Sequence, residues 1–126
     1  MTSTQSELEL GRERSARIER ASRGRDLSNL HVAVVWFQQL AYTHAHKIHA
    51  ALTKIGCGSV RLEQGGPCHL PPMGVYFCVD DRSHTPPGAC LLLEILKEAD
   101  ILDSNELERY FYGKPGTVYI LVGKKS

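Results

Sequence analysis

The chain repeats the pattern strand, helix, strand, and no other feature of the sequence constrains its fold as strongly. In the first copy, an apolar strand at His31–Trp36 is joined through a helical segment to a strand at Ser59–Glu63. In the second copy, a strand at Val75–Val79 is joined in the same way to a strand at Thr117–Val122. Two such copies predict a domain whose helices pack against a shared sheet.

The helix of each copy is predicted from its apolar spacing and from the residues at its ends. In the first helix, apolar residues recur at alternating spacings of four and three, which is typical of one buried stripe: Ala41, Ala45, Ile48, Leu52 and Ile55. Gly56 follows at the position of a C-cap. In the second helix, Thr85 is predicted to be the N-cap and Pro86 the first helical residue.

The chain order β-α-β-β-α-β, with right-handed crossovers, predicts an α+β protein. The most direct arrangement is a ferredoxin-like two-layer sandwich, in which a four-stranded sheet carries both helices on one face. The alternative is a three-layer α/β arrangement with one helix on each face of the sheet, and the sequence does not distinguish between the two. The strand at His31–Trp36 is apolar on both faces, which favours a central position in the sheet.

The first 26 residues differ in composition from the rest of the chain. Arginines are interspersed with acidic residues, and few large apolar side chains lie among them. We therefore divide the chain into a charged N-terminal extension, residues 1–26, that is helical or partly disordered, and an α+β domain, residues 27–126. Because Glu, Leu, Arg and Ala are good helix formers, the extension is compatible with a helix. Such a helix either stays solvated or docks on a partner or a second copy of the chain.

Length and charge narrow the classes of function. The chain has 126 residues and a formal net charge of +1, so its overall field does not favour nucleic acids, even though Tyr76 and Tyr119 lie on predicted strands. No stretch approaches the roughly 20 apolar residues of a membrane span. The first residues do not resemble a secretory signal, so we expect a cytoplasmic protein. Two of the four cysteines, Cys78 and Cys90, are predicted to be buried and reduced.

The segment Asp80–Thr85 is the strongest candidate for a functional site. It follows the carboxyl end of a predicted strand and precedes a helix, which is where ligands bind in open α/β sheets. The helix start offers free backbone N–H groups and Arg82 offers a bidentate contact, so we predict a small anionic ligand. The predicted ligand-binding residues are Asp80, Asp81, Arg82, Ser83, His84 and Thr85. The two neighbouring carboxylates would repel an anion unless they pair with the arginine or with a cation.

Residues for two other kinds of site are also present. His84 with a neighbouring aspartate would form an acid–base pair, but nothing in the sequence fixes its geometry, so no catalytic residue and no cofactor is predicted. Cys57, Cys68 and His69 could approach one another through the Gly- and Pro-rich loop after the second strand. This proximity keeps zinc binding open as an alternative, although no metal site is predicted.

The stretch from Arg25 to Lys124 resembles an uncharacterised bacterial soluble α+β module. The resemblance rests on Arg25-Asp-Leu-Ser28, on the apolar spacing of both helices and on the terminal strand Val118-Tyr-Ile-Leu-Val-Gly-Lys124. In similar chains the module follows membrane helices or a coiled segment and lies in the cytoplasm. The resemblance therefore implies a fold and a compartment but no catalytic residue. This chain departs from the pattern at Gln38-Gln39, where similar chains tend to have a Pro/Gly-rich turn.

Together these features predict a non-catalytic cytoplasmic module with a sensory or assembly role, which binds a small anionic ligand at the loop after the third strand. The alternative is a small nucleotide-binding protein or enzyme that uses the same loop. A protein partner or a second copy would bind residues 1–26 or the open face of the sheet. Trp36, Tyr76 and Tyr119, if they lie together on that face, would form an aromatic surface suited to self-association.

Overall fold

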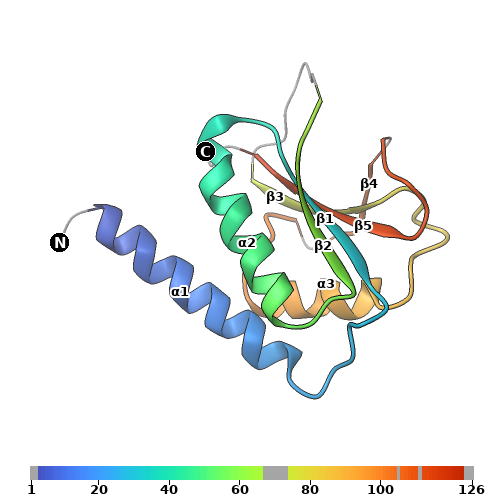
Figure 1. Ribbon diagram of the computed structural model, residues 1–126, viewed down its shortest axis with the longest axis horizontal. Coiled ribbons are helices and arrows are strands. Elements are labelled where there is room, and N and C mark those ends of the chain that lie inside the picture. The colour runs from blue at the N-terminus through green and yellow to red at the C-terminus, as the bar shows by residue number, and fades with distance from the viewer. Residues whose placement is uncertain (1–2, 67–73, 105, 111, 124–126) are drawn as a thin grey trace.

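The structure is α+β, with a five-stranded mixed sheet and three α-helices (Figure 1). The computed structural model describes residues 3–66, 74–104, 106–110 and 112–123. In chain order the elements are α1 (Ser3–Ser22), β1 (His31–Trp36), the 3₁₀ turn η1 (Gln39–Ala41), α2 (Tyr42–Lys54), β2 (Ser59–Gln64), β3 (Val75–Val79), α3 (Ala89–Glu98), β4 (Glu108–Arg109) and β5 (Thr117–Val122).

Two parallel βαβ units share the sheet, and the last strand joins them. The strand order is β2-β1-β5-β3-β4. Strands β1 and β2 are parallel neighbours connected through α2, and β3 and β4 are parallel neighbours connected through α3. Strand β5 lies between the units, parallel to β1 and antiparallel to β3. The central position predicted for β1 is confirmed.

The predicted α+β class is confirmed, but the predicted number of four strands is wrong. The fifth strand, β4, lies between α3 and β5, where the chain order β-α-β-β-α-β predicts no strand. Two residues are too few to show an alternating pattern in the sequence. The ferredoxin-like arrangement is not shown, because its βαβ units are split by another strand, whereas β1 and β2 pair directly.

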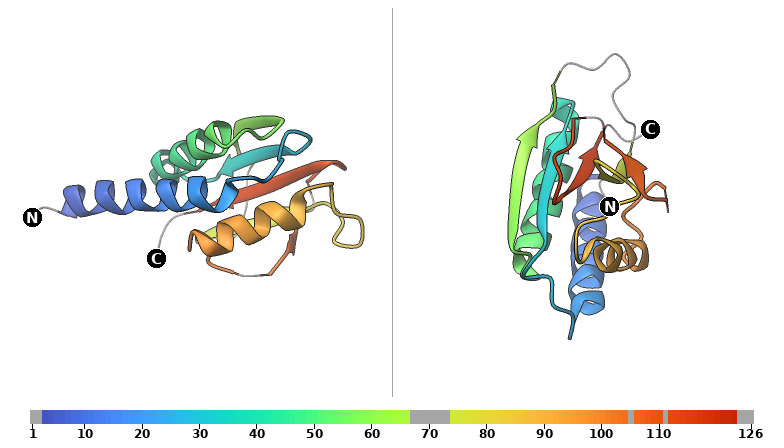
Figure 2. Two further views of the ribbon diagram at one scale, coloured as in Figure 1. Left: turned by 90° about the horizontal axis from the view of Figure 1, so that it is seen from below. Right: turned by 90° about the vertical axis from the view of Figure 1, so that its right-hand side faces the viewer.

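All three helices lie on the same side of the sheet, and α1 packs against α2 and α3 (Figure 2). Their buried side chains belong to one apolar core with alternate residues of β1, β3 and β5. The strand residues of this core are Val32, Val34, Val75, Phe77, Val79, Val118, Ile120 and Val122. A smaller buried cluster lies on the opposite face, and its residues come from strands and their flanking segments, with no helical residue among them. In the right view of Figure 2, α2 lies behind β1 and β2, and α3 lies beneath β3 and β5.

Helix α1 is held by its C-terminal half. That half lies between α2 and α3, while the N-terminal half projects beyond the rest of the molecule (Figures 1 and 2, left). Ile18 is only 1% exposed and belongs to the main core. Two ion pairs connect this region to its neighbours: Glu19 with Lys54 of α2 at 2.9 Å, and Arg25 with Glu94 of α3 at 3.5 Å. Among the described residues, no helix combines the length and the apolar character that crossing a membrane requires.

The sequence predicts the end of α2 correctly but places the start of α3 at the wrong residue. Gly56 lies just beyond α2 with a φ of 89°, so the predicted glycine at the helix end is confirmed. Helix α3, in contrast, begins at Ala89, so the prediction of Thr85 as N-cap and Pro86 as first helical residue is wrong. The second proline of the Pro-Pro pair disfavours helical backbone at Pro86, and the helix starts only after it.

Replacing Ile18 by alanine should lower the free energy of unfolding by about 2–5 kcal/mol, because a buried side chain is lost from between three helices. The thermal midpoint should fall by roughly 3–6 °C for each kcal/mol in a chain of 126 residues. Denaturant unfolding followed through the fluorescence of Trp36, the one tryptophan of the chain, measures the change. Arg20→Ala, at an exposed position of the same helix, is the matched control and should stay within about 0.5 kcal/mol of the parent. Equal midpoints for the two variants would contradict the packing of α1.

Candidate functional site

The predicted ligand loop, Asp80–Thr85, leaves the carboxyl end of β3. Strand β3 runs antiparallel to β5, and β5 runs parallel to β1. The loop after β3 therefore lies at the end of the sheet where β1 and β5 start. Among the strands of this sheet, β4 alone runs parallel to β3 and finishes at the same end. The rule that ligands bind beyond the carboxyl ends of neighbouring parallel strands therefore applies here to β3 and β4 alone.

Asp81 organises a tight turn inside this loop. Its Oδ1 atom accepts a hydrogen bond from the backbone N–H of Ser83 at 2.9 Å, and its Oδ2 atom lies 3.1 Å from Nδ1 of His84. The backbone N–H of His84 donates to the carbonyl of Asp81 at 3.2 Å. The N–H of Ser83 is the main cause that lowers the pKa of Asp81, and the His84 ring adds to the effect. Both oxygens of this carboxylate are thus engaged within the turn.

An arginine from a distant part of the sequence joins this turn. The Nε atom of Arg109, on β4, donates to the backbone carbonyl of Asp80 at 3.2 Å, and its charge helps to lower the pKa of Asp81. The pairing of β3 with β4 places Arg109 here. The sequence does not predict a role for Arg109, because the two residues of β4 form no recognisable strand pattern. Arg82 and Thr85 are exposed, and the anion site remains a prediction.

The cysteines differ in their environments. Cys78 is buried as predicted, and burial followed by the charge of Glu108 raises its pKa to about 12. Cys57 is half-buried, and burial raises its pKa to about 11. Cys90 is exposed, so its predicted burial is wrong. It follows Ala89 at the start of α3, and Ala89, rather than Cys90, faces the core.

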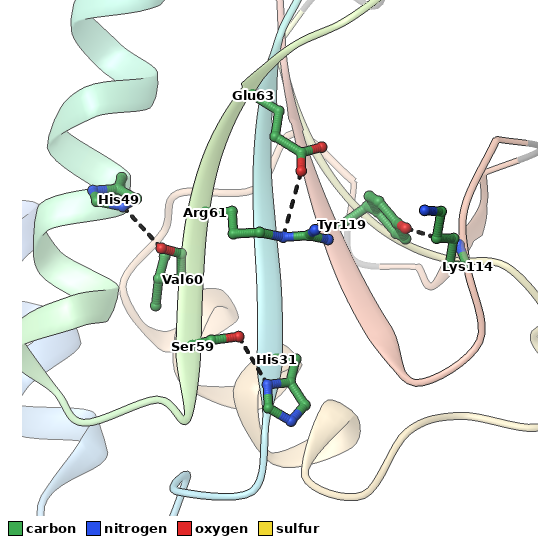
Figure 3. Close-up of polar contacts among 8 residues, drawn as sticks. All are labelled: His31, His49, Ser59, Val60, Arg61, Glu63, Lys114 and Tyr119. Atoms are coloured by element: carbon green, nitrogen blue, oxygen red, sulfur yellow. Dashed lines mark hydrogen bonds and ion pairs between the residues drawn. The ribbon is translucent and has the colours of Figure 1, made fainter.

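The zinc alternative involves Cys57, Cys68 and His69. Cys68 and His69 lie outside the described residues. Within the described segments, no three side chains of His, Cys, Asp or Glu come together in a way that would hold a metal ion. Two of the described histidines make polar contacts elsewhere: Nδ1 of His31 lies 2.8 Å from Oγ of Ser59, and Nε2 of His49 lies 3.0 Å from the carbonyl oxygen of Val60 (Figure 3).

The face of the sheet without helices has a buried centre and a polar margin. Tyr119 is only 4% exposed, because the ring of Tyr110 packs against it with centroids 5.0 Å apart. Its hydroxyl accepts a hydrogen bond from the backbone N–H of Lys114 at 2.8 Å (Figure 3). Trp36 packs instead against the core on the helical side. The expected aromatic surface of Trp36, Tyr76 and Tyr119 is therefore not present on this face.

A separate apolar surface lies where β1 leads into α2. Leu40 is 77% exposed and Tyr42 is 38% exposed. The Tyr42 ring packs edge-on against Trp36 with centroids 5.2 Å apart, and it lies 6.1 Å from the ring of His46. These contacts fix the orientation of Tyr42 but leave part of its ring open to solvent.

The carboxyl group of Asp81 should titrate below the usual aspartate range. Since its folded-state pKa is lowered, its contribution to stability is present at neutral pH and is lost as the pH falls through that pKa. In His84→Ala the pKa should rise but remain below the usual range, because the N–H of Ser83 still donates. Carboxyl chemical shifts in an NMR titration measure both values. A pKa in His84→Ala equal to that of an unperturbed aspartate would contradict the leading role of Ser83.

Comparisons with known proteins do not connect the chain to a family. No protein-family model matches it, and neither do any curated protein sequence or any solved structure at a significant level.

Proposed function

We propose that this protein is a non-catalytic cytoplasmic assembly module that binds a protein partner through the projecting half of α1. The observation that carries the proposal is the way the helix is held. Its C-terminal half is fixed between α2 and α3 through Ile18, and its N-terminal half extends past them (Figure 2, left). One end is thus fixed to the domain, and the other end is available for a partner.

The energetics of short helices support this role. An isolated helix of fewer than about 12–15 residues is marginal in water, because nucleation is costly. The 20 residues of α1 avoid that cost, since the anchored half supplies the nucleus for the projecting half. A partner that packs on the projecting half therefore finds a helix that is already formed, and loses less conformational entropy on binding. The projecting sequence contains both Leu8 and Leu10 among its polar residues.

A sensory role would add ligand binding at the loop Asp80–Thr85. Two arginines support an anionic ligand there: Arg82 is exposed on the turn, and Arg109 bonds the carbonyl of Asp80. Arginine presents a planar set of donors that suits phosphate and carboxylate groups. An enzyme that uses the same loop is the alternative. It is less well supported, because the Asp81 carboxylate is already engaged within its own turn.

Deleting residues 3–11 should abolish binding of the partner and leave the stability of the domain within about 0.5 kcal/mol of the parent, because this half of α1 projects from the core. The measurement is co-purification with the tagged full chain from the cells that produce it, followed by reconstitution from purified components. Asp81→Asn and His84→Ala are the matched controls and should retain the partner. Retention of the partner by the shortened chain would overturn the proposal, and so would a catalytic turnover that Asp81→Asn removes.

The sensory role is tested by thermal shift with inorganic phosphate, a nucleoside monophosphate and a sugar phosphate. A ligand at about 100 times its Kd should stabilise the fold by roughly 2.7 kcal/mol. Arg82→Ala should remove the shift, whereas Lys97→Ala, which removes the same charge from an exposed position on α3, should preserve it. A flat panel, or a shift that persists in Arg82→Ala, would refute ligand binding at this loop.

A further inference from the structure

Strand β2 forms one edge of the sheet, and half of its backbone polar groups point away from β1. In a parallel ladder only alternate residues of a strand bond to its neighbour. The N–H of Ser59 donates to the carbonyl of Leu30 at 3.3 Å, and the N–H of Gly65 donates to that of Trp36 at 2.7 Å. The odd-numbered residues therefore bond to β1, and the even-numbered residues direct their N–H and C=O groups outwards: Val60, Leu62 and Gln64. The right view in Figure 2 shows β2 at the outer edge of the sheet.

This edge lacks most of the usual devices that prevent strands from pairing, and the two charged residues that it carries, Arg61 and Glu63, are of opposite sign. Natural edges are commonly blocked by proline, by lysine or by a bulge. The sequence of β2, SVRLEQ, has neither proline nor lysine, and its register with β1 is continuous. The flank of α2 beside the edge carries no permanent charge. His49 contacts Val60 there, and spacings of three and four place Tyr42, His46 and Thr53 on the same flank.

We propose that a second copy of this chain pairs with β2 in antiparallel orientation, about a two-fold axis that passes beside Leu62. In this register Leu62 and the partner's Leu62 exchange two backbone hydrogen bonds. Val60 exchanges two more with the partner's Gln64, and symmetry repeats these at the other end. All the outward groups of Val60, Leu62 and Gln64 are then satisfied, and the two sheets become one continuous sheet.

Charge complementarity selects this register. Arg61 and Glu63 lie on the face without helices, on either side of Leu62, and their side chains are 51% and 42% exposed (Figure 3). Antiparallel pairing about Leu62 sets Arg61 opposite the partner's Glu63, and Glu63 opposite the partner's Arg61. These are non-hydrogen-bonded pairs, in which side chains approach most closely. The present Arg61–Glu63 contact of 3.4 Å within one strand is exposed and of low energy, so it can be exchanged for the contacts between copies.

The neighbouring symmetric registers lack this complementarity, because an axis beside Arg61 or Glu63 would set that residue opposite its own copy, so that like charges face each other. An axis beside Val60 would set Arg61 opposite the partner's Ser59, and an axis beside Gln64 would set Glu63 opposite the partner's Gly65. Neither brings opposite charges together. Of these symmetric registers, the one about Leu62 therefore places opposite charges of the two copies of β2 side by side.

The contact of His49 with Val60 is compatible with the pairing. A carbonyl oxygen only accepts hydrogen bonds, so Nε2 of His49 carries the proton of this bond. A carbonyl oxygen has two lone pairs, and the oxygen of Val60 can accept a second bond, from the N–H of the partner's Gln64. His49 then stabilises the strand in the single chain without closing its edge.

The test is sedimentation velocity of the full chain over a concentration series that reaches about 1 mM, because contacts of small area give weak dimers. The parent should form a reversible dimer. Arg61→Glu should raise the dissociation constant by about tenfold, since two attractive pairs become repulsive, and Glu63→Arg should do the same. The double variant Arg61→Glu/Glu63→Arg should restore the parent value. Lys97→Glu, which makes the same charge change at an exposed position on α3, is the control and should leave the dimer intact.

Gln64→Pro provides a second, independent variant. The N–H of Gln64 points outwards, so proline removes a donor of the dimer and none of the bonds to β1. Dimerisation should be lost while the circular dichroism spectrum is retained.

A chain that is monomeric at every concentration would overturn the proposal, as would a double variant that fails to restore the dimer. A dimer that depends on residues 3–11 and not on β2 would also overturn it, while leaving the function proposed for α1 in place. Conversely, partner binding that is independent of α1 would refute that function without affecting the pairing of β2.

Discussion

The insertion of β5 between β1 and β3 is the constraint on which the rest of the fold depends. Without β5 the two βαβ units would share no strand contact, because β1 and β3 each pair with it and not with one another. Ile120 is fully buried and lies in register with Val34 on one side and Phe77 on the other. The shared core beneath the helices therefore depends on a strand near the end of the described chain. Pairing over such separations slows folding, since the intervening segments must be ordered before the contacts form.

The sequence predicts the strands that are long and buried. It does not predict strands that form only because they pair with a distant part of the chain. The runs at β1 and β3 are apolar on both faces and could be assigned from composition, and Gly56 marked the end of α2. The two residues of β4 are strand only because they lie beside β3, and no local pattern encodes that contact. Thr85 and Pro86 predict a helix start, but Pro87 disfavours helical backbone at Pro86, and α3 begins only at Ala89.

The same limit applies to the candidate site. The order of Asp81, Ser83 and His84 predicts a polar turn, and the structure shows how its hydrogen bonds are distributed. The sequence could not show that β3 runs against β1 and β5, and this orientation moves the loop away from the carboxyl ends of those strands. It also could not show that Arg109 reaches Asp80, since the contact spans 29 positions of the chain. The hydrogen-bonded turn is therefore predictable from residues close in sequence. The distant residues that surround the turn, such as Arg109, depend on the direction and pairing of the strands.

The position of β5 also determines which surfaces are left for assembly. Because the last strand occupies the centre, the outer strand of each βαβ unit becomes an edge of the sheet. At one edge β4 has only two residues, and a strand this short offers little backbone for pairing. At the other edge β2 has six residues, and its alternate backbone groups point away from β1. The projecting half of α1 extends from the helical layer and is separate from this edge, so one molecule can use the helix for a partner and the strand for a second copy.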